Sequence, residues 1–281
     1  MILFKTTESL QNHLEKLAAQ GLTIGFVPTM GALHNGHLSL IHKCREQCDI
    51  TVCCIFVNPT QFNDKSDFEK YPVVIGNDIY LLETSWTDIL FLPSVDEIYT
   101  DGLQQLQQFQ LGYLENILEG KYRPGHFQGV CNVVYRLLNI VKPGIIFLGR
   151  KDYQQYLVLK TMMQEFYPAI KIGLVDIARQ PNGLAMSSRN MRLGQKALAS
   201  AAAIYQSLQF IKQNISEKNI DTLKSGVIQK LLQQGFDKVD YVEICDADTL
   251  LPVTAFDKEK KFIALIAAFI ENVRLIDNMM L

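Results

Sequence analysis

Two histidines separated by two residues, His34 and His37, are well suited to phosphate chemistry. They stand in residues 28–38, PTMGALHNGHL, which follow an apolar run and lead into a helical pattern. A helix start offers N–H groups and the positive end of the helix dipole, which together favour an anion. Gly31 and Gly36 let the backbone approach a ligand closely. We expect a phosphate-binding turn here; the alternatives are two surface histidines or a pair of metal ligands.

The spacing of the two glycines superficially matches a P-loop, G-x-x-x-x-G. However, His37 and Leu38 stand where a P-loop has its lysine and its serine or threonine. The lysine and the magnesium-binding hydroxyl are therefore missing, which excludes a P-loop NTPase. The chain also lacks a G-x-G-x-x-G string, which disfavours a dinucleotide site.

A second polar string, residues 56–62 with the sequence FVNPTQF, ends another apolar run. Amides at the end of a parallel strand face the crevice where such sheets bind ligands. Gln61 could there hold a hydroxyl and a carboxylate of a small substrate; an ordinary turn with an Asn-Pro stop is the alternative. Residues 123–130, RPGHFQGV, are typical of a Pro-Gly turn before a helix, and we interpret His126 as structural.

A further string, residues 149–155 with the sequence GRKDYQQ, follows the apolar run 145–148. Lys151 supplies a point charge for phosphates, and Asp152 could hold magnesium. Gln155 is placed to act with Gln61. Alternatively, Asp152 is only a helix N-cap beside a solvated lysine.

The last of these strings, residues 183–190 with the sequence GLAMSSRN, combines two hydroxyls with a guanidinium. Ser187, Ser188 and Arg189 on a flexible loop would form an anion clamp that delivers positive charge as a site closes. An exposed polar linker between domains is the alternative interpretation.

Short apolar runs alternate with helical patterns through the first two-thirds of the chain, and this rhythm predicts a doubly wound parallel sheet. We expect strands at 22–27, ending before Pro28, and at 50–57, 89–92, 145–148 and 170–177. We expect helices at 9–20, 37–48, 67–84, 129–141 and 152–166. After about residue 178 the pattern changes to helices near 192–216 and 220–234 and β-segments at 239–245 and 262–270.

The fold class expected from this pattern is α/β: a Rossmann-like domain, residues 1–177, and a smaller C-terminal α+β lid domain, residues 178–281. The length of 281 residues exceeds the ~250 at which a single core tends to stop growing. With a net charge of -2 the protein has no positive electrostatic field over its whole surface to attract a nucleic-acid backbone, although a local basic pocket is still compatible with this charge. Residues 262–270 are the longest apolar run, about half of a membrane helix, and the N-terminus lacks a signal peptide's apolar stretch.

From these features we expect a soluble cytoplasmic protein with no nucleic-acid and no membrane partner. The six cysteines are thinly spread and form no zinc set, so we expect them to be reduced and buried.

The string His34-Asn35-Gly36-His37 is the H-x-G-H signature of the nucleotidyltransferase superfamily, and residues 28–40 resemble the pantothenate synthetase family in particular. The family's F-V-N-P-x-Q-F and R-P-G-H-F-x-G-V are both present. Its G-E-K-D-x-Q-Q appears with Arg150 in place of glutamate, and its D-G-L-A-x-S-S-R-N with Asn182 in place of aspartate. The latter string is also similar to the K-M-S-K-S loop of class I aminoacyl-tRNA synthetases. Thr249-Leu250 and residues 274–278 extend the resemblance into the C-terminal domain.

The resemblance implies that pantoate and ATP form pantoyl adenylate and pyrophosphate, and that β-alanine then displaces AMP. It implies Mg²⁺ with ATP, a homodimer and no tightly bound organic cofactor. The implied catalytic residues are His34, His37, Lys151 and Arg189. ATP is expected to meet Met30, Gly31, Ala32, Leu33, His34, Asn35, Gly36, His37, Gly149, Arg150, Lys151, Asp152, Ala178, Met186, Ser187, Ser188 and Arg189.

Pantoate or β-alanine is expected to meet Gln61, Gln155 and Met30, with Asp152 as the candidate metal ligand beside the ATP phosphates. Two rival functions remain open at this point. Another H-x-G-H enzyme would lack Gln61 and Gln155 together. A silent homologue acting as a binding or regulatory subunit would be expected to have lost at least one of His37, Lys151 or Arg189, and all three are present.

Overall fold

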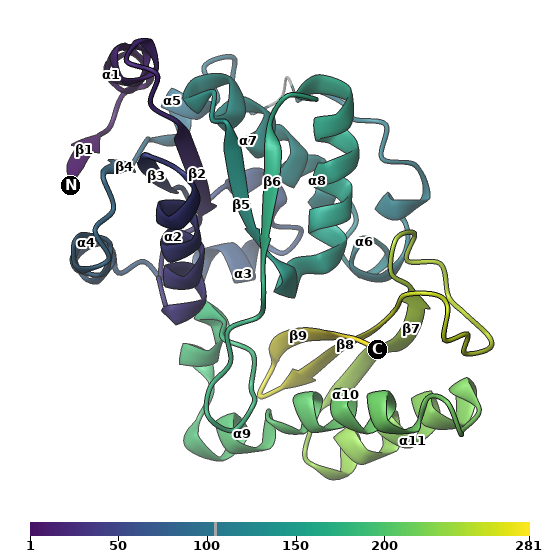
Figure 1. Cartoon of the computed structure of the whole chain (residues 1–281). Helices are drawn as coiled ribbons and strands as arrows, with labels where there is room; N and C mark the ends of the chain where they lie inside the picture. The colour runs from purple at the N-terminus through teal and green to yellow at the C-terminus, as the bar shows by residue number, and fades with distance from the viewer. Residues whose placement is uncertain (104–105) are drawn as a thin grey trace. The chain divides into compact units, whose positions relative to one another are not determined.

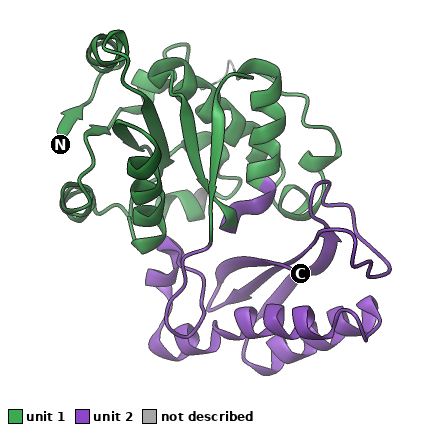
Figure 2. Cartoon of the chain, in the orientation of Figure 1, with its two compact units in different colours: residues 1–150, 155–176 green, residues 151–154, 177–281 purple. Residues whose placement is uncertain are grey.

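The computed structural model describes residues 1–103 and 106–281 and divides the chain into two compact units. Unit 1 comprises Met1–Arg150 and Gln155–Asp176, and unit 2 comprises Lys151–Gln154 and Ile177–Leu281 (Figure 2). The short segment Lys151–Gln154 therefore groups with unit 2, although the residues on either side of it in sequence belong to unit 1.

Unit 1 is built on a six-stranded sheet in which every pair of neighbouring strands is parallel (Figure 1). Its strands, in spatial order, are β1 (Ile2–Phe4), β4 (Ile89–Phe91), β3 (Ile50–Ile55), β2 (Ile24–Thr29), β5 (Ile145–Gly149) and β6 (Lys171–Val175). The central strands are almost wholly buried, as a parallel sheet covered on both faces requires. The predicted α/β class and parallel sheet are confirmed.

Helices connect these strands. They are α1 (Thr7–Ala19), α2 (Asn35–Gln47), α3 (Lys65–Glu69), α4 (Ile75–Thr84), α5 (Val95–Ile98), α6 (Leu118–Tyr122), α7 (His126–Val141) and α8 (Tyr153–Phe166), with 3-10 turns η1 (Pro59–Gln61), η2 (Gly112–Glu115) and η3 (Arg150–Asp152). The predicted single helix 67–84 is wrong: it is two helices, α3 and α4. Pro72 separates them because a proline disfavours helical backbone at the residue before it.

The order of the strands fixes where the chain reverses direction across the sheet. From β2 the chain moves outward through β3 to β4, and it then returns to the other side of β2 for β5 and β6. The pairing of β2 with β5 covers only Gly25 with Ile145 and Phe26 with Ile146, so these strands separate toward their carboxyl ends. Doubly wound sheets bind ligands at such a switch point.

Strand β2 continues past Pro28 to Thr29, so the predicted stop at this proline is wrong. The Thr29 carbonyl accepts the N–H of Phe56 beyond β3, so residue 28, one step back, faces the β5 side. Pairing with β5 has already ended at Phe26, and the donor that proline lacks is therefore not needed.

Unit 2 is a three-stranded antiparallel sheet packed on helices. Its strands are β7 (Lys238–Asp246), β8 (Phe262–Ile270) and β9 (Val273–Met280), and its helices are η4 (Ser188–Arg192), α9 (Gln195–Ser200), α10 (Ala203–Asn214) and α11 (Ile220–Gln233). The predicted helix 192–216 is wrong as one element, because its start belongs to η4 and residues 201–202 separate α9 from α10. The predicted β-segments and the long helix 220–234 are present.

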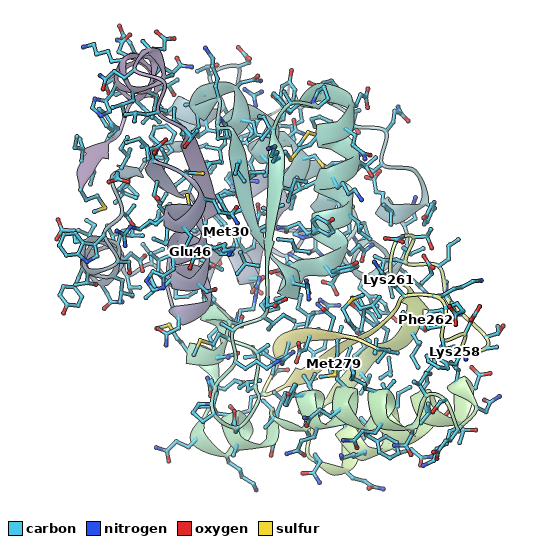
Figure 3. The ribbon with its side chains drawn as sticks, in the orientation of Figure 1. Met30, Glu46, Lys258, Lys261, Phe262 and Met279 are labelled. Carbon is cyan, nitrogen blue, oxygen red and sulfur yellow. The ribbon has the colours of Figure 1, made fainter. Side chains whose placement is uncertain are left out.

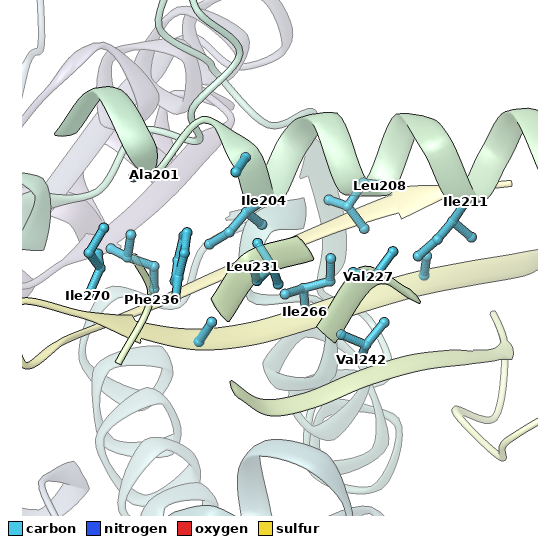
Figure 4. Packing of buried hydrophobic residues seen from close by; sticks show 14 of the residues in the cluster. Ala201, Ile204, Leu208, Ile211, Val227, Leu231, Phe236, Val242, Ile266 and Ile270 are labelled. Carbon is cyan, nitrogen blue, oxygen red and sulfur yellow. The ribbon is translucent and has the colours of Figure 1, made fainter. Parts of the chain in front are cut away.

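A hydrophobic core holds unit 2 together (Figure 4). The side chains of α10 that enter it recur at helical spacing: Ile204, Leu208 and Ile211. They meet Val227 and Leu231 of α11 and the inner face of the sheet. Each such side chain, fully buried, stabilises the fold by about 1.5–3 kcal/mol.

The six cysteines are free thiols, and five of them are buried. Burial raises the pKa of Cys44 to about 12, so this thiol is inert at neutral pH. The expectation of reduced cysteines that act as small hydrophobes is confirmed for these five. No helix within residues 1–103 and 106–281 has the length and apolar character needed to cross a membrane.

Candidate active site

Predicted chemical residues follow three of the parallel strands in sequence. The H-x-G-H turn follows β2, the Asn-Pro turn follows β3 and the Gly-Arg-Lys-Asp turn follows β5. Because all three strands are parallel, these turns share one edge of the sheet, and Met30 directly follows β2 at this edge (Figure 3).

His34 and His37 form a closed cap at the start of α2. The His34 ring accepts the Gly36 N–H through Nδ1 at 3.1 Å, and the His37 ring accepts the His34 N–H through Nδ1 at 3.3 Å. The rings stack with centroids 4.1 Å apart. A ring nitrogen that accepts a hydrogen bond carries no proton, so both neutral rings carry theirs on Nε2. Each ring therefore has an Nε2–H donor in addition to the Nδ1 acceptor that forms the cap.

The prediction that this helix start offers its N–H groups to phosphate is wrong for two of them. The Gly36 N–H is taken by the His34 ring, and the His37 N–H donates to the His34 carbonyl at 2.7 Å. Anion binding by this turn, which stays a prediction, would then depend on the imidazole Nε2–H groups and on the helix dipole. Within the described residues no group of three or more metal-ligating side chains occurs.

Asp78 of α4 holds the turn that precedes the histidines. Its carboxylate accepts the Ala32 N–H at 2.9 Å and the Leu33 N–H at 2.7 Å, and its side chain is fully buried. Gly31 and Ala32 have φ of 78° and 48°, a left-handed backbone that costs energy at an alanine. Burial raises the pKa of Asp78, and its two backbone hydrogen bonds oppose this shift.

Gln61 lies in η1 and is oriented by a fully buried neighbour. Asn58 donates through Nδ2 to the Gln61 Oε1 at 3.1 Å, while the Gln61 Nε2 donates to the Met30 Sδ at 2.8 Å. The Asn58 Oδ1 accepts the hydroxyl of Tyr99 at 2.7 Å. The side-chain amide of Gln61 is thereby held beside Met30 at the strand edge.

Residues in the first turns of α7 pack against η1 and fix its position. The buried His126 ring bonds through Nδ1 to the Gln61 carbonyl at 2.7 Å, so its interpretation as a structural histidine is confirmed. A Cβ at Gly129 would lie 2.2 Å from the Thr60 carbonyl oxygen, so only glycine lets α7 approach η1 this closely. The Asn58 amide also donates to the Gly129 carbonyl at 3.1 Å.

Arg150, which replaces the family's glutamate, has a local partner. Its guanidinium lies 2.7 Å from the Asp176 carboxylate, just beyond the end of the adjacent strand β6. This pair is largely exposed and contributes little stability. The glycine turn and the residues that follow Arg150 keep the family's pattern.

In unit 2, the Lys151 ammonium contacts the Asp152 carboxylate at 3.2 Å. Asp152 is the more exposed of the two, with 44% of its side chain accessible. Proteins commonly hold Mg²⁺ through one or two carboxylates together with substrate phosphates and water. A single carboxylate of this exposure fits a magnesium ion carried by a phosphate chain, and Asp152 as its ligand stays a prediction.

Residues 178–186 form a short hairpin, in which Arg179 pairs with Ala185 and the Met186 N–H donates to the Ala178 carbonyl at 3.0 Å. Asn182 accepts the Leu184 N–H through Oδ1 at 3.1 Å. The aspartate of the family's pattern could accept the same bond, so this replacement leaves the turn intact.

The Ser-Ser-Arg segment continues from this hairpin into η4. Ser187 caps η4, with Oγ accepting the Arg189 N–H at 3.3 Å. Ser188 and Asn190 are buried, and the Asn190 amide donates to the Ala185 carbonyl at 3.0 Å. This organised segment is not the exposed linker of the alternative interpretation.

Some functional residues escaped the sequence analysis. Asp78 is a fully buried polar group whose backbone partners lie on another element, and its only signal in the sequence was an aspartate within the apolar pattern of α4. Asn58, also fully buried, stood in the string 56–62, but its contacts with Tyr99 and Gly129 were not predicted. Gln155 lies half-buried in the first turn of α8, and its joint action with Gln61 stays a prediction. Contacts of Ala178, Lys151 and Arg189 with a nucleotide stay predictions as well.

The sequence pattern of the family described as Pantoate-beta-alanine ligase matches residues 2–280. The chain is 42% identical over 279 residues to the pantothenate synthetase of Azobacteroides pseudotrichonymphae, covering 99% of each chain. It is 42% identical over 285 residues to that of Thermotoga petrophila, covering 100% of each.

Solved structures agree with the sequence comparison. The crystal structure of pantothenate synthetase from Thermus thermophilus superposes with a TM-score of 0.90 at 34% identity, covering 99% of each chain. Pantoate-beta-alanine ligase from Francisella tularensis, complexed with beta-gamma ATP and beta-alanine, gives a TM-score of 0.84 at 38% identity. That match covers 100% of this chain and 97% of the other.

Proposed function

This chain belongs to the pantoate–β-alanine ligase family, and from that premise we propose that it joins pantoate to β-alanine through a pantoyl adenylate made from ATP. In the first step the pantoate carboxylate attacks the α-phosphorus of ATP and pyrophosphate leaves. In the second step the β-alanine amine attacks the acyl carbonyl and AMP leaves. The carboxylate is itself the nucleophile, so no protein nucleophile is required.

The histidine cap supplies donors for the first step. Charge on the phosphoryl oxygens changes as pyrophosphate departs, and preorganised donors aimed at that charge lower the barrier. The two Nε2–H groups of His34 and His37 are held by the ring contacts to the backbone, so no reorganisation is needed when the charge develops. Their neutral tautomers donate without carrying a full charge.

The acid is held by amides in unit 1. The Gln61 amide, fixed by Asn58, can exchange its contact with the Met30 sulfur for a hydroxyl or carboxylate of pantoate. Gln155 supplies the second amide, and Met30 an apolar wall. A neutral amide suits a substrate whose carboxylate must stay nucleophilic, because an ion pair with a cation would hold its charge too tightly.

Unit 2 supplies the cations. Lys151, Arg189 and the hydroxyls of Ser187 and Ser188 bind the phosphates, and the backbone near Ala178 meets adenine. Asp152 would be the protein ligand of a magnesium ion bound mainly by the ATP phosphates, and this ion would supply positive charge against the triphosphate. The protein works in the cytoplasm as a homodimer, as the resemblance to its family suggests.

The observation that carries the proposal is the coexistence of the histidine cap with the fixed Gln61 amide at one edge of the same sheet. Another H-x-G-H enzyme would share the cap. The Asn58–Gln61–Met30 arrangement, supported by His126 and Gly129, is the part that selects a small hydroxy acid.

The test is to mix the protein with ATP, Mg²⁺ and pantoate and to measure pyrophosphate before and after β-alanine is added. We expect one equivalent of pyrophosphate per site before β-alanine and continuous turnover to AMP and pantothenate afterwards. Pantoate lacking its hydroxyls serves as the control substrate and should support far less release. Pyrophosphate release that is indifferent to pantoate would exclude the proposal.

A further inference from the structure

We propose that Asp277 and Asn278, adjacent residues of β9, are positioning residues for the adenylation step. They anchor two segments to the same strand: the turn Arg150–Asp152, called here the Lys151 turn, and the Ser-Ser-Arg segment, Ser187–Arg189. The inference rests on the proposed function, since Lys151 and Arg189 must act on the triphosphate for their relative position to matter. Neither β9 residue is a predicted ligand of ATP, pantoate or β-alanine.

Asp277 reaches the Ser-Ser-Arg segment through Arg179. The carboxylate of Asp277, which is 4% exposed, accepts both terminal nitrogens of Arg179, at 2.6 and 3.0 Å. The guanidinium also donates to the Gly183 carbonyl at 3.0 Å and lies 4.3 Å from the centre of the Tyr205 ring. A bidentate, buried pair of this kind fixes both the position and the plane of the arginine.

The position of Arg179 also determines where the rest of the hairpin, residues 178–186, and the segment after it lie. Arg179 pairs with Ala185, whose carbonyl accepts the side-chain amide of Asn190 in η4. Ser187 and Arg189 lie between these two points. The Asp277 carboxylate therefore sets the position of the whole segment through a single arginine.

Asn278 reaches the Lys151 turn directly. Its Nδ2 donates to the Lys151 carbonyl at 2.9 Å, and its backbone N–H donates to Asp277 Oδ1 at 2.8 Å. The Tyr153 hydroxyl adds a second tie to unit 2 by donating to the Ala247 carbonyl at 3.0 Å. These bonds explain why Lys151–Gln154 groups with unit 2, away from its neighbours in sequence (Figure 2).

Two adjacent residues on one strand thus hold the segments of two cationic side chains that are far apart in sequence. Catalysis by charged groups depends on geometry, and a misplacement of about 1 Å can cost ~10²-fold in rate. A variant that removes the Asn278 contact should slow adenylation by displacing Lys151, and one that weakens the Asp277–Arg179 contact should do so by displacing Arg189. In both variants the glutamines of unit 1 should still bind pantoate.

The test is a double-mutant cycle on single-turnover adenylation, using the full chain with saturating ATP, Mg²⁺ and pantoate. We expect Asn278→Ala to slow the step by ~10-fold or more, with an unchanged KM for pantoate. In the Lys151→Ala background the same change should cost less than about 2-fold, because the group it positions is already absent. Val227→Ala, a truncation in the core of unit 2 away from both ties, controls for lost stability and should show equal effects in both backgrounds.

A second double-mutant cycle tests the Asp277–Arg179 contact, and it keeps the proposal testable if Asn278→Ala does not fold. Arg179→Lys keeps the charge opposite Asp277 but loses the bidentate contact, and it should couple in the same way with Arg189→Ala. Additive losses in both cycles, in a protein whose wild type releases pyrophosphate, would overturn the positioning role alone. A wild type that releases none would instead overturn the proposed function.

Discussion

The histidine turn depends on the protonation state of its own rings. His34 and His37 each use Nδ1 as an acceptor from a backbone N–H, so a proton on either Nδ1 would place two donors face to face. The same rings then have Nε2–H as the group that can reach a phosphate. The cap uses Nδ1 of each ring and the proposed chemistry uses Nε2, so side chains that mimic one nitrogen at a time can separate the two roles.

Asparagine and glutamine make this separation at His37. An asparagine amide reaches about as far as Nδ1, whereas a glutamine amide reaches about as far as Nε2. We expect His37→Asn to keep the cap and its thermal stability but to slow adenylation by ~10²-fold, because one preorganised donor is lost. His37→Gln should recover part of that rate and lose about 0.5–2 kcal/mol of stability with the cap. Single-turnover rates and urea unfolding measure the two effects; full activity in the asparagine variant would remove Nε2 from the mechanism.

Asp78 predicts a pH dependence whose sign can be worked out. Burial raises the pKa of Asp78 in the folded protein above its value in the unfolded chain. A group with a raised folded pKa contributes stability that is fully present below the unfolded pKa and is lost as pH rises through the folded pKa. The stability of the wild type relative to Asp78→Asn should therefore be most favourable at acid pH and decline toward neutrality.

Urea unfolding of both proteins at several values between about pH 4 and pH 7 measures this difference, starting near the ordinary aspartate pKa of about 3.9. Asp49, whose pKa is lowered by its bonds to Thr23, is the matched control. Asp49→Asn should give the opposite slope, since a lowered pKa adds stability above the unfolded value. A wild-type advantage at Asp78 that grows with pH would mean that its two backbone hydrogen bonds outweigh burial.

At the scale of elements, the approach of α7 to η1 decides where Gln61 lies. Gly129→Ala would place a Cβ 2.2 Å from the Thr60 carbonyl oxygen, so helix and turn must separate. We expect a loss of about 1–3 kcal/mol in stability, as for other overpacked sites, and a raised KM for pantoate with little change for ATP. Steady-state kinetics with each substrate varied in turn measure this split.

Gly226→Ala in α11 is the matched control. A Cβ at this exposed helical position meets nothing within 4 Å, and alanine is a better helix former than glycine. This variant should gain about 0.5–1 kcal/mol and keep both KM values. Equal kinetic effects of the two substitutions would refute a specific role for the α7–η1 contact.

Local patterns predicted those elements whose residues decide their own conformation. The apolar runs of β3, β4 and β5 and the helical spacing in α1 and α11 were sufficient to place these elements. Strand β9 was missed because the turn before it, Glu271–Asn272, takes positive φ at both residues without the Asn-Gly or Asp-Gly signal of such turns. Edge strand β1, three residues long, gave no pattern at all.

The site was predictable to the same extent. Residues with unusual chemistry beside glycine or proline, such as His34, Gln61 and Lys151, were visible in the sequence. Asp78 gave no comparable signal, because it acts through the backbone N–H groups of Ala32 and Leu33, many residues away. Asn58 and Asn278 stood in motif strings, but their contacts with the distant carbonyls of Gly129 and Lys151 could not be predicted from those strings. The prediction of free N–H groups at α2 failed for a related reason, since a histidine side chain took the place of the ligand.

At the scale of the whole molecule, the chemical groups are divided between two units. Unit 1 contains the histidine cap and the amides proposed to hold pantoate, and unit 2 contains Lys151 and the Ser-Ser-Arg segment. The proposed reaction takes two successive steps in the same protein. Negative charge develops at different atoms in the two steps, so rates measured for each step separately can show which groups act in it.

The histidines should act mainly in the first step. Pyrophosphate leaves during adenylation, and charge on the phosphoryl oxygens then changes most; in the second step the acyl–oxygen bond breaks, and AMP leaves with its phosphate already formed. We therefore expect His34→Ala and His37→Ala to slow pantoyl-adenylate formation by ~10²-fold or more. Supplied with preformed adenylate and β-alanine, the same variants should lose much less activity.

Single-turnover rates for each half-reaction measure the difference. Gln61→Ala is the comparison variant, because it is expected to weaken binding of the pantoyl group in both half-reactions. Equal losses in the two half-reactions would assign the histidines a role shared by both steps, such as stabilising departing AMP or taking the amine proton.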